Sequence, residues 1–211
     1  MTEKPLPQPP AINMSFGIMG YGITRAGTPA EQVAAQDRIW TILETVTHPG
    51  LPPWALLSQD WLGANRLRVQ LFHHGDTRDN DTMKVGMKRL TETLRRHGLE
   101  SLLGTYVSPD TPRPSAVWRV PAEADAIGLF MQELYFGFHI LVPEDLRFAL
   151  LANDGDYVAF AAPEDFLREA LPPEAIGRKA TAELIEELEQ GYEPGSFDRV
   201  LAHYEPFMLT R

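Results

Sequence analysis

The sequence predicts an α+β fold whose antiparallel β-sheet is centred on a three-stranded meander at about residues 136–162 and is flanked by helices. Three short apolar runs, rich in residues that favour strands, predict the meander: residues 138–142, 146–151 and 157–161. The second and third runs are separated by Asn153-Asp154-Gly155, which is typical of a hairpin turn. Apolar residues at helical spacing before and after these runs supply the flanking helices.

The chain begins with an arm that carries Pro5, Pro7, Pro9 and Pro10. Proline at this density favours an extended, mobile segment, so we expect residues 1–12 to lie outside the folded part. Residues 13–211 are long enough for one domain with a single good core. A division near residues 108–114, where three prolines cluster, is the alternative.

The first helix is predicted from its start signal. Thr28-Pro29-Ala30-Glu31 has the form of a capping box with proline at the first helical position. The apolar residues of this segment recur at helical spacing and predict one buried face: Val33, Ile39, Ile42, Leu43 and Val46. Pro49-Gly50 would then end the helix.

The middle of the chain alternates between strand and helix patterns. Residues 51–64 read as a packed connector, and alternation over residues 66–72 predicts a half-exposed strand. The next helix ends at Gly98 with cations in its last turn, where they suit the helix dipole; its apolar stripe is Met83, Met87, Leu90 and Leu94. Residues 99–107 fit strand or loop, whereas residues 115–120 predict a strand and residues 122–136 a helix.

Three further helices come after the meander. Pro163 opens the first of them, and Glu164 and Asp165 in its first turn favour the dipole. A longer acidic helix is predicted over residues 174–190, and a final helix ends near Tyr204. Within the meander, Gly155 is expected at a positive φ, so that Gly155→Val would cost about 1–2 kcal/mol of stability.

Composition limits the classes of function. The chain has no cysteine, which removes disulfides, thiolate nucleophiles and cysteine-based metal sites together. Its N-terminus lacks the apolar segment of a secretory signal, and no apolar run approaches the length of a membrane span. We therefore expect a cytoplasmic protein without a membrane partner.

The net charge of −10 is distributed unevenly along the chain. Residues 1–120 carry a net charge of +2, and residues 121–211 a net charge of −12. A negative field of this size repels nucleic acid and attracts basic proteins. The alternative interpretation is a solvated acidic surface that keeps the protein soluble.

One loop carries residues of the types that bind divalent metals: His73, His74, Asp76, Asp79 and Asp81. Their spacing matches neither a metalloprotease helix nor a calcium-binding loop. A polar turn whose aspartates cap the next helix is the favoured interpretation of these residues. A metal site formed by His73, His74 and Asp76 is therefore the alternative hypothesis, and no other cofactor is indicated.

The sequence contains no assembled catalytic motif, which favours a binding protein over an enzyme. Because antiparallel strands reverse direction, Glu144 and Asp145 should lie at the same end of the sheet as Glu164 and Asp165. We expect these four carboxylates to bind a basic protein partner. An immunity-type inhibitor of a basic toxin or nuclease fits this hypothesis; a metal-dependent enzyme or sensor at residues 73–81 is the alternative.

Overall fold

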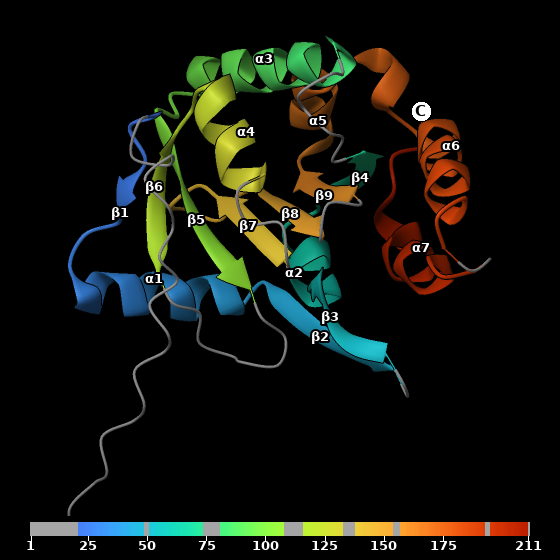
Figure 1. The fold of residues 1–211 in the computed structure, drawn as a ribbon, viewed down its shortest axis with the longest axis horizontal. Helices are drawn as coiled ribbons and strands as arrows, with labels where there is room; N and C mark the ends of the chain where they lie inside the picture. The colour runs from blue at the N-terminus through green and yellow to red at the C-terminus, as the bar shows by residue number, and fades with distance from the viewer. Residues whose placement is uncertain are drawn as a thin grey trace, which may run out of the picture.

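The computed structural model describes residues 21–48, 51–73, 81–107, 116–132, 138–153, 157–192 and 195–210, and it confirms the mixed α+β fold (Figure 1). Seven strands form one antiparallel sheet in the order β1-β6-β5-β7-β8-β9-β4. Their bounds are β1 Thr24–Arg25, β4 Arg68–His73, β5 Ser101–Val107, β6 Val117–Pro121, β7 Phe138–Val142, β8 Ala149–Asn153 and β9 Tyr157–Ala162. A separate two-stranded sheet pairs β2 (Leu43–His48) with β3 (Leu51–Leu57).

The large sheet is buried on both faces because its central strands are apolar throughout. All described residues of β7, β8 and β9 are buried. Successive side chains of β9 alternate between two cores: Tyr157 and Ala159 pack on one side, Val158 and Phe160 on the other. This period of two is the geometry of a strand covered from both faces.

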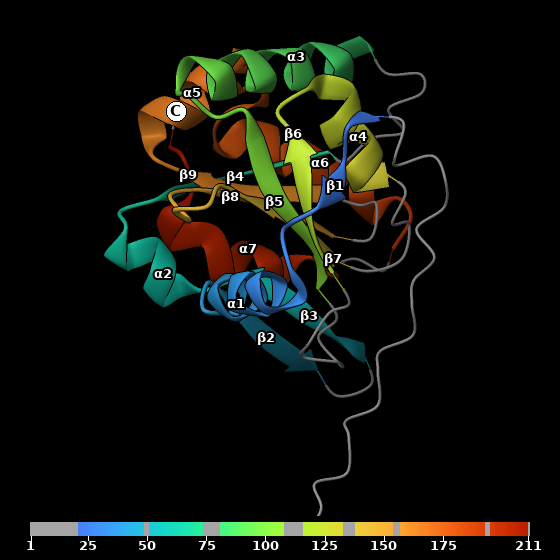
Figure 2. The same ribbon diagram turned by 90° about the vertical axis from the view of Figure 1, so that its left-hand side faces the viewer.

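Three helices cover the first face: α3 (Asp81–Arg96), α4 (Ala124–Gln132) and α5 (Glu164–Ala170) (Figure 2). Apolar residues of each helix pack onto the sheet, among them Leu90, Ile127 and Leu167. Two predictions are confirmed here, because α3 carries Arg95 and Arg96 in its last turn and α5 carries Glu164 and Asp165 in its first.

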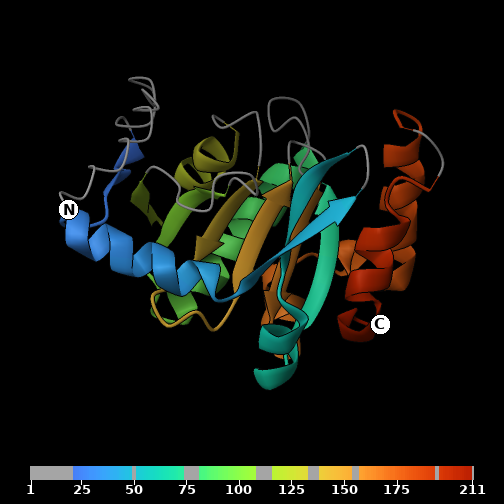
Figure 3. The ribbon, with the colours of Figure 1, turned by 90° about the horizontal axis from the view of Figure 1, so that it is seen from below.

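The opposite face is covered by α1 (Pro29–Trp40), the β2–β3 hairpin, α2 (Gln59–Ala64) and α7 (Asp198–Tyr204) (Figure 3). The longer helix α6 (Arg178–Glu189) lies beside the edge strand β4. Tyr204 of α7 is fully buried, and its hydroxyl accepts a hydrogen bond from the Leu57 backbone N–H at 2.9 Å. This contact fastens the C-terminal helix to the hairpin.

The first helix starts as predicted but ends earlier. Thr28 and Glu31 form the complete capping box. The helix stops at Trp40, and the subsequent segment Leu43–His48 is strand β2 instead of the last helical turns. The prediction that Val33 is buried is also wrong, since its side chain is 52% exposed. Leu43 and Val46 pair with Leu57 and Trp54 of β3 instead of continuing the helix, whereas Ile42 lies in the turn between α1 and β2.

The meander is present, with one shift in its middle strand. β8 begins at Ala149, because Leu146 has a φ of 55° and its N–H bonds to the Pro143 carbonyl in a turn. The register pairs Asn153 with Tyr157, so residues 154–156 connect β8 to β9. Gly155, the proline-rich residues 1–12 and residues 108–114 all lie outside the described residues.

Candidate functional site

The two carboxylate pairs lie at the same end of the sheet. Glu144 and Asp145 belong to the connection between β7 and β8, and Glu164 opens α5 directly after β9. The register pairs Ala149 with Ala161, which places the start of β8 beside the end of β9. The first pair follows β7, however, and the second follows β9, with β8 lying between these two strands.

Arginines accompany three of these four carboxylates. Glu144 pairs with Arg119 of β6 at 2.8 Å, and its backbone carbonyl accepts a hydrogen bond from Arg38 of α1. Asp145 lies 3.5 Å from the Arg147 guanidinium, and Glu164 lies 2.7 Å from that of Arg168. All these groups face solvent, where one such pair contributes about 0–1 kcal/mol. This end of the sheet therefore presents mixed charge, which weakens the attraction that four carboxylates alone would exert.

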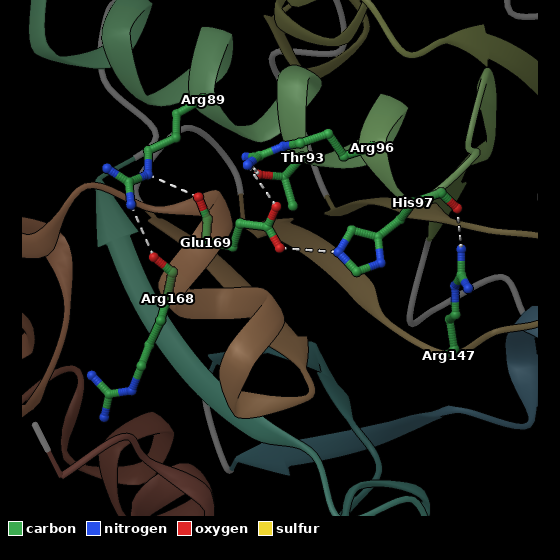
Figure 4. A network of polar contacts seen from close by, with 7 residues as sticks. All are labelled: Arg89, Thr93, Arg96, His97, Arg147, Arg168 and Glu169. Carbon is green, nitrogen blue, oxygen red and sulfur yellow. Dashed lines mark hydrogen bonds and ion pairs between the residues drawn. The ribbon is translucent and has the colours of Figure 1, made fainter.

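Glu169 of α5 is the centre of a polar network with α3 (Figure 4). One carboxylate oxygen lies 3.0 Å from Arg96 Nη1, and the other lies 3.0 Å from His97 Nε2. The hydrogen bond with His97 lowers the pKa of the Glu169 carboxyl, and the neighbouring Arg96 lowers it further. The network favours the charged carboxylate and ties the last turn of α3 to α5.

Two arginines extend this network to backbone carbonyls. Arg89 donates from Nε to the Glu169 carbonyl at 2.8 Å and from Nη2 to the Arg168 carbonyl at 3.1 Å. These are carbonyls at the end of α5, where a helix has no intrahelical donors left. Arg147 donates to the His97 carbonyl at 3.3 Å. These contacts join α3, α5 and the β7–β8 connection. We therefore interpret the network as a structural one that holds these elements together.

The metal hypothesis falls mainly on residues that the structure does not describe. His73 ends β4 and is half-buried, whereas His74 and Asp76 lie outside the described residues. Across the strands, His73 pairs with Tyr157, and Tyr157 pairs with Asn153. Among the described residues, no three His, Asp or Glu side chains gather to hold a metal ion.

The outer face of α6 is a second acidic surface. Its carboxylates run from the middle of the helix to its end: Glu183, Glu186, Glu187 and Glu189. Glu183 pairs with Lys179 at 3.3 Å, and Glu205 with Arg178 at 3.8 Å. Glu186 and Glu187 are exposed and have no ion-pair partner within the described part of the chain.

The charges of α6 oppose its helix dipole. The helix begins with Arg178 and Lys179, and its last turns carry glutamates. A helix N-terminus favours anions and its C-terminus cations, so both ends carry the less favourable charge. In contrast, α1 and α5 have acidic residues in the first turn and basic residues in the last. The sequence indicates an acidic helix here, but not that its charge order is reversed.

An exposed aromatic residue lies just beyond this acidic half. The Tyr192 side chain is 50% exposed, and its ring meets Phe197 edge-on with 5.4 Å between centroids. Phe197 is buried, and its ring centroid lies 6.3 Å from that of Trp54 in the hairpin. Tyr192 thus extends from a packed aromatic cluster into solvent beside the α6 glutamates.

None of the described helices is long and apolar enough to cross a membrane. Comparisons of the chain with protein-family models, with curated proteins and with solved structures found no match.

Proposed function

We propose that this chain is a non-catalytic binding protein that takes a basic protein as its partner, with the outer face of α6 as the main contact surface. The observation that carries this proposal is the reversed charge order of α6, with Glu186 and Glu187 exposed. Such an arrangement weakens the isolated helix, since glutamates three and four residues apart repel each other. Departures from the preferred charge order of a helix are typical of surfaces that serve a function.

The proposal also has a kinetic reason. A concentrated negative potential steers a basic partner to its surface, raises the association rate and makes that rate sensitive to salt. Tyr192 adds a half-exposed ring of the type that is enriched in protein interfaces. An inhibitor of a basic toxin or nuclease, the immunity-type role, is the specific form that this chemistry supports.

The carboxylates at the sheet end form the second surface of the proposal. Glu144, Asp145, Glu164 and Asp165 are exposed, so a basic partner has access to them. The partner must compete there with Arg119, Arg147 and Arg168 for the same oxygens. We therefore expect their contribution to affinity to be smaller than that of α6.

The test is a capture experiment from the native host at low salt with two charge-matched variants. The double variant Glu186→Lys and Glu187→Lys should lose most of the captured protein, as measured by quantitative mass spectrometry. The pair Glu164→Lys and Asp165→Lys changes the net charge by the same amount and should retain most of it.

The outcomes separate a site from a general charge effect. Equal loss in both double variants would mean that net charge, and not α6, drives the capture. Recovery of no basic protein by the unmodified chain at low salt would count directly against the proposal.

The metal-dependent enzyme or sensor is the second candidate function. The cross-strand row of His73, Tyr157 and Asn153 favours it, because the register places these three polar residues side by side on neighbouring strands. Elemental analysis of protein purified without an affinity tag tests the candidate. Absence of bound metal, with an unchanged melting temperature after addition of Zn²⁺ or Mn²⁺, would remove it.

A further inference from the structure

Glu189, the last residue of α6, is bonded at two points to the segment that leads from α6 to α7. Its backbone carbonyl accepts a hydrogen bond from the Tyr192 N–H at 3.3 Å. Its carboxylate Oε1 accepts another from the Gly195 N–H at 2.8 Å. A bond from a backbone N–H to a carboxylate is charge-assisted and stronger than a neutral one. Glu189 is thus bound into the fold of this segment, whereas Glu186 and Glu187 of the same helix are exposed.

Gly195 is fixed from the other side by the start of α7. Its φ of 82° lies in the region that favours glycine, and a Cβ there would lie 3.1 Å from Asp198 Oδ2. Its carbonyl accepts a hydrogen bond from the Asp198 N–H at 3.2 Å. The bond between Gly195 and Glu189 therefore ties the end of α6 to the first turn of α7.

The Tyr192 ring is held by this closed segment and is still half exposed. It meets the buried Phe197 ring edge-on, and Phe197 meets Tyr157 of β9 edge-on with 6.2 Å between centroids. A row of rings thus connects the surface with the core of the sheet. The other exposed large apolar side chains among the described residues, Tyr21 and Val33, lie next to β1 and in α1, away from α6 (Figure 1).

We propose that Tyr192 is the anchor of the contact with a basic protein, and that Glu189 is the positioning residue that presents it. The inference rests on the proposed function and specifies the partner further: its basic surface contains an apolar depression that receives the Tyr192 ring. Tyrosine is enriched among the few residues that dominate binding energy. A ring already held against Phe197 loses little freedom on binding, and this preorganisation raises affinity.

Two glutamine variants separate positioning from charge. Glu189→Gln removes one charge and keeps an oxygen that accepts the Gly195 N–H, whereas Glu187→Gln removes one charge from an exposed side chain. The probe is the basic-protein fraction of the native host, collected on a cation-exchange resin and passed over each immobilised variant at low salt and sub-saturating load. Quantitative mass spectrometry should show retention about two- to fivefold lower for Glu187→Gln and nearly unchanged for Glu189→Gln.

Two alanine variants test the anchor. Tyr192→Ala should lower retention by about tenfold. Glu189→Ala loses the bond to Gly195 and should lower retention nearly as much. The double variant should be no weaker than Tyr192→Ala alone, because the two changes remove the same contact.

The outcomes separate this inference from the proposed function on which it rests. If the double variant shows the product of the two single losses, or if Glu189→Gln loses as much as Glu187→Gln, Glu189 contributes only charge. The inference then fails while the proposed function stands. Retention of no basic protein by the unmodified chain would overturn both.

Fluorine NMR tests the positioning role without a partner. In protein labelled with fluorotyrosine, the Tyr192 signal is assigned by its loss in Tyr192→Phe. It should keep its position in Glu189→Gln and move in Glu189→Ala to that of an exposed, freely rotating tyrosine. A Tyr192 signal that stays in place in Glu189→Ala would overturn the inference.

Discussion

Gly104 allows α4 to approach the sheet closely. A Cβ at this position of β5 would lie 2.6 Å from the Phe130 ring and 2.9 Å from Leu141 Cδ2, both of which are buried. Real Cβ atoms essentially never come this close to another heavy atom, so the ring or the strand would have to move. The absence of a side chain at Gly104 therefore sets the distance between helix and strand.

Gly104→Ala should lower the free energy of unfolding by about 1–3 kcal/mol, the usual cost of overpacking a core. Gly128→Ala, in α4, is the comparison, since a Cβ there meets no atom within 4 Å. It should raise stability by up to about 1 kcal/mol, because alanine favours a helix interior. Chemical denaturation of both variants measures the difference; a neutral Gly104→Ala would show that the Phe130 ring can rotate away at little cost.

Leu146 shows where an apolar sequence pattern predicts the wrong local structure. Leu146 belongs to an apolar run that predicts a strand, yet it adopts a positive φ in a turn. Its neighbour Arg147 donates its N–H to Asp145 Oδ1, a local bond that favours a turn over a ladder. Asp145 is a residue type that forms such turns, but the apolar residues after it predict a strand.

At the level of helices, one charged side chain adds to the apolar packing between α3 and α5. Glu169 bonds to His97 and Arg96, and the His97 hydrogen bond holds the pKa of its carboxyl below the usual value. A group whose pKa is lower in the folded state stabilises the fold above its unfolded pKa. That contribution is lost as the pH falls through the folded value.

Glu169→Gln should therefore lower the melting temperature at neutral pH by a few degrees. The difference from the unmodified protein should shrink as the pH falls through the lowered pKa of the folded carboxyl, where the unmodified protein also becomes protonated. Thermal melts between neutral and acidic pH measure it. Glu92→Gln, the same change on an exposed part of α3, should have little effect; equal behaviour of the two variants would contradict a specific role for Glu169.

The helices differ in how far their charges can be interpreted from the sequence. For α1 and α5 the charge order and the start signals agree, and the sequence predicts both helix starts. For α6 the composition is recognisably acidic, but the helix begins at Arg178 after a short 3₁₀ turn at Pro173–Ala175. Its start is set by the bond between Gly177 and Gln70, residues that lie far apart in the sequence.

Across the whole molecule, local pairings could be predicted and distant ones could not. The meander of β7, β8 and β9 results from short connections and turn residues. The pairings of β4 with β9 and of β1 with β6 join segments that are far apart, and nothing local in the sequence encodes them. The contacts of Glu144 with its arginines also join distant segments, because Arg119 and Arg38 reach it from β6 and α1.

The strand order has a consequence for residues 108–114, where the sequence allows a division of the chain. Strands from before and after this segment alternate in one sheet: β6 lies between β1 and β5, and β4 lies beside β9. The first part holds no two neighbouring strands of the large sheet; the second holds β7, β8 and β9 as neighbours, but α1, the β2–β3 hairpin and α3, which help to cover the two faces, belong to the first part. Each part would expose apolar strand faces that the other part covers.

A cleavage experiment tests this interdependence. With a protease site inserted after Asp110, the cut protein should elute as one species in native buffer and unfold in a single transition. The two fragments should separate only in denaturant, and neither should show a cooperative transition when it is purified alone. Release of two independently folded pieces on cleavage would mean that the pairings of β6 with β5 and of β4 with β9 contribute little to stability, in conflict with the burial of both faces of the sheet.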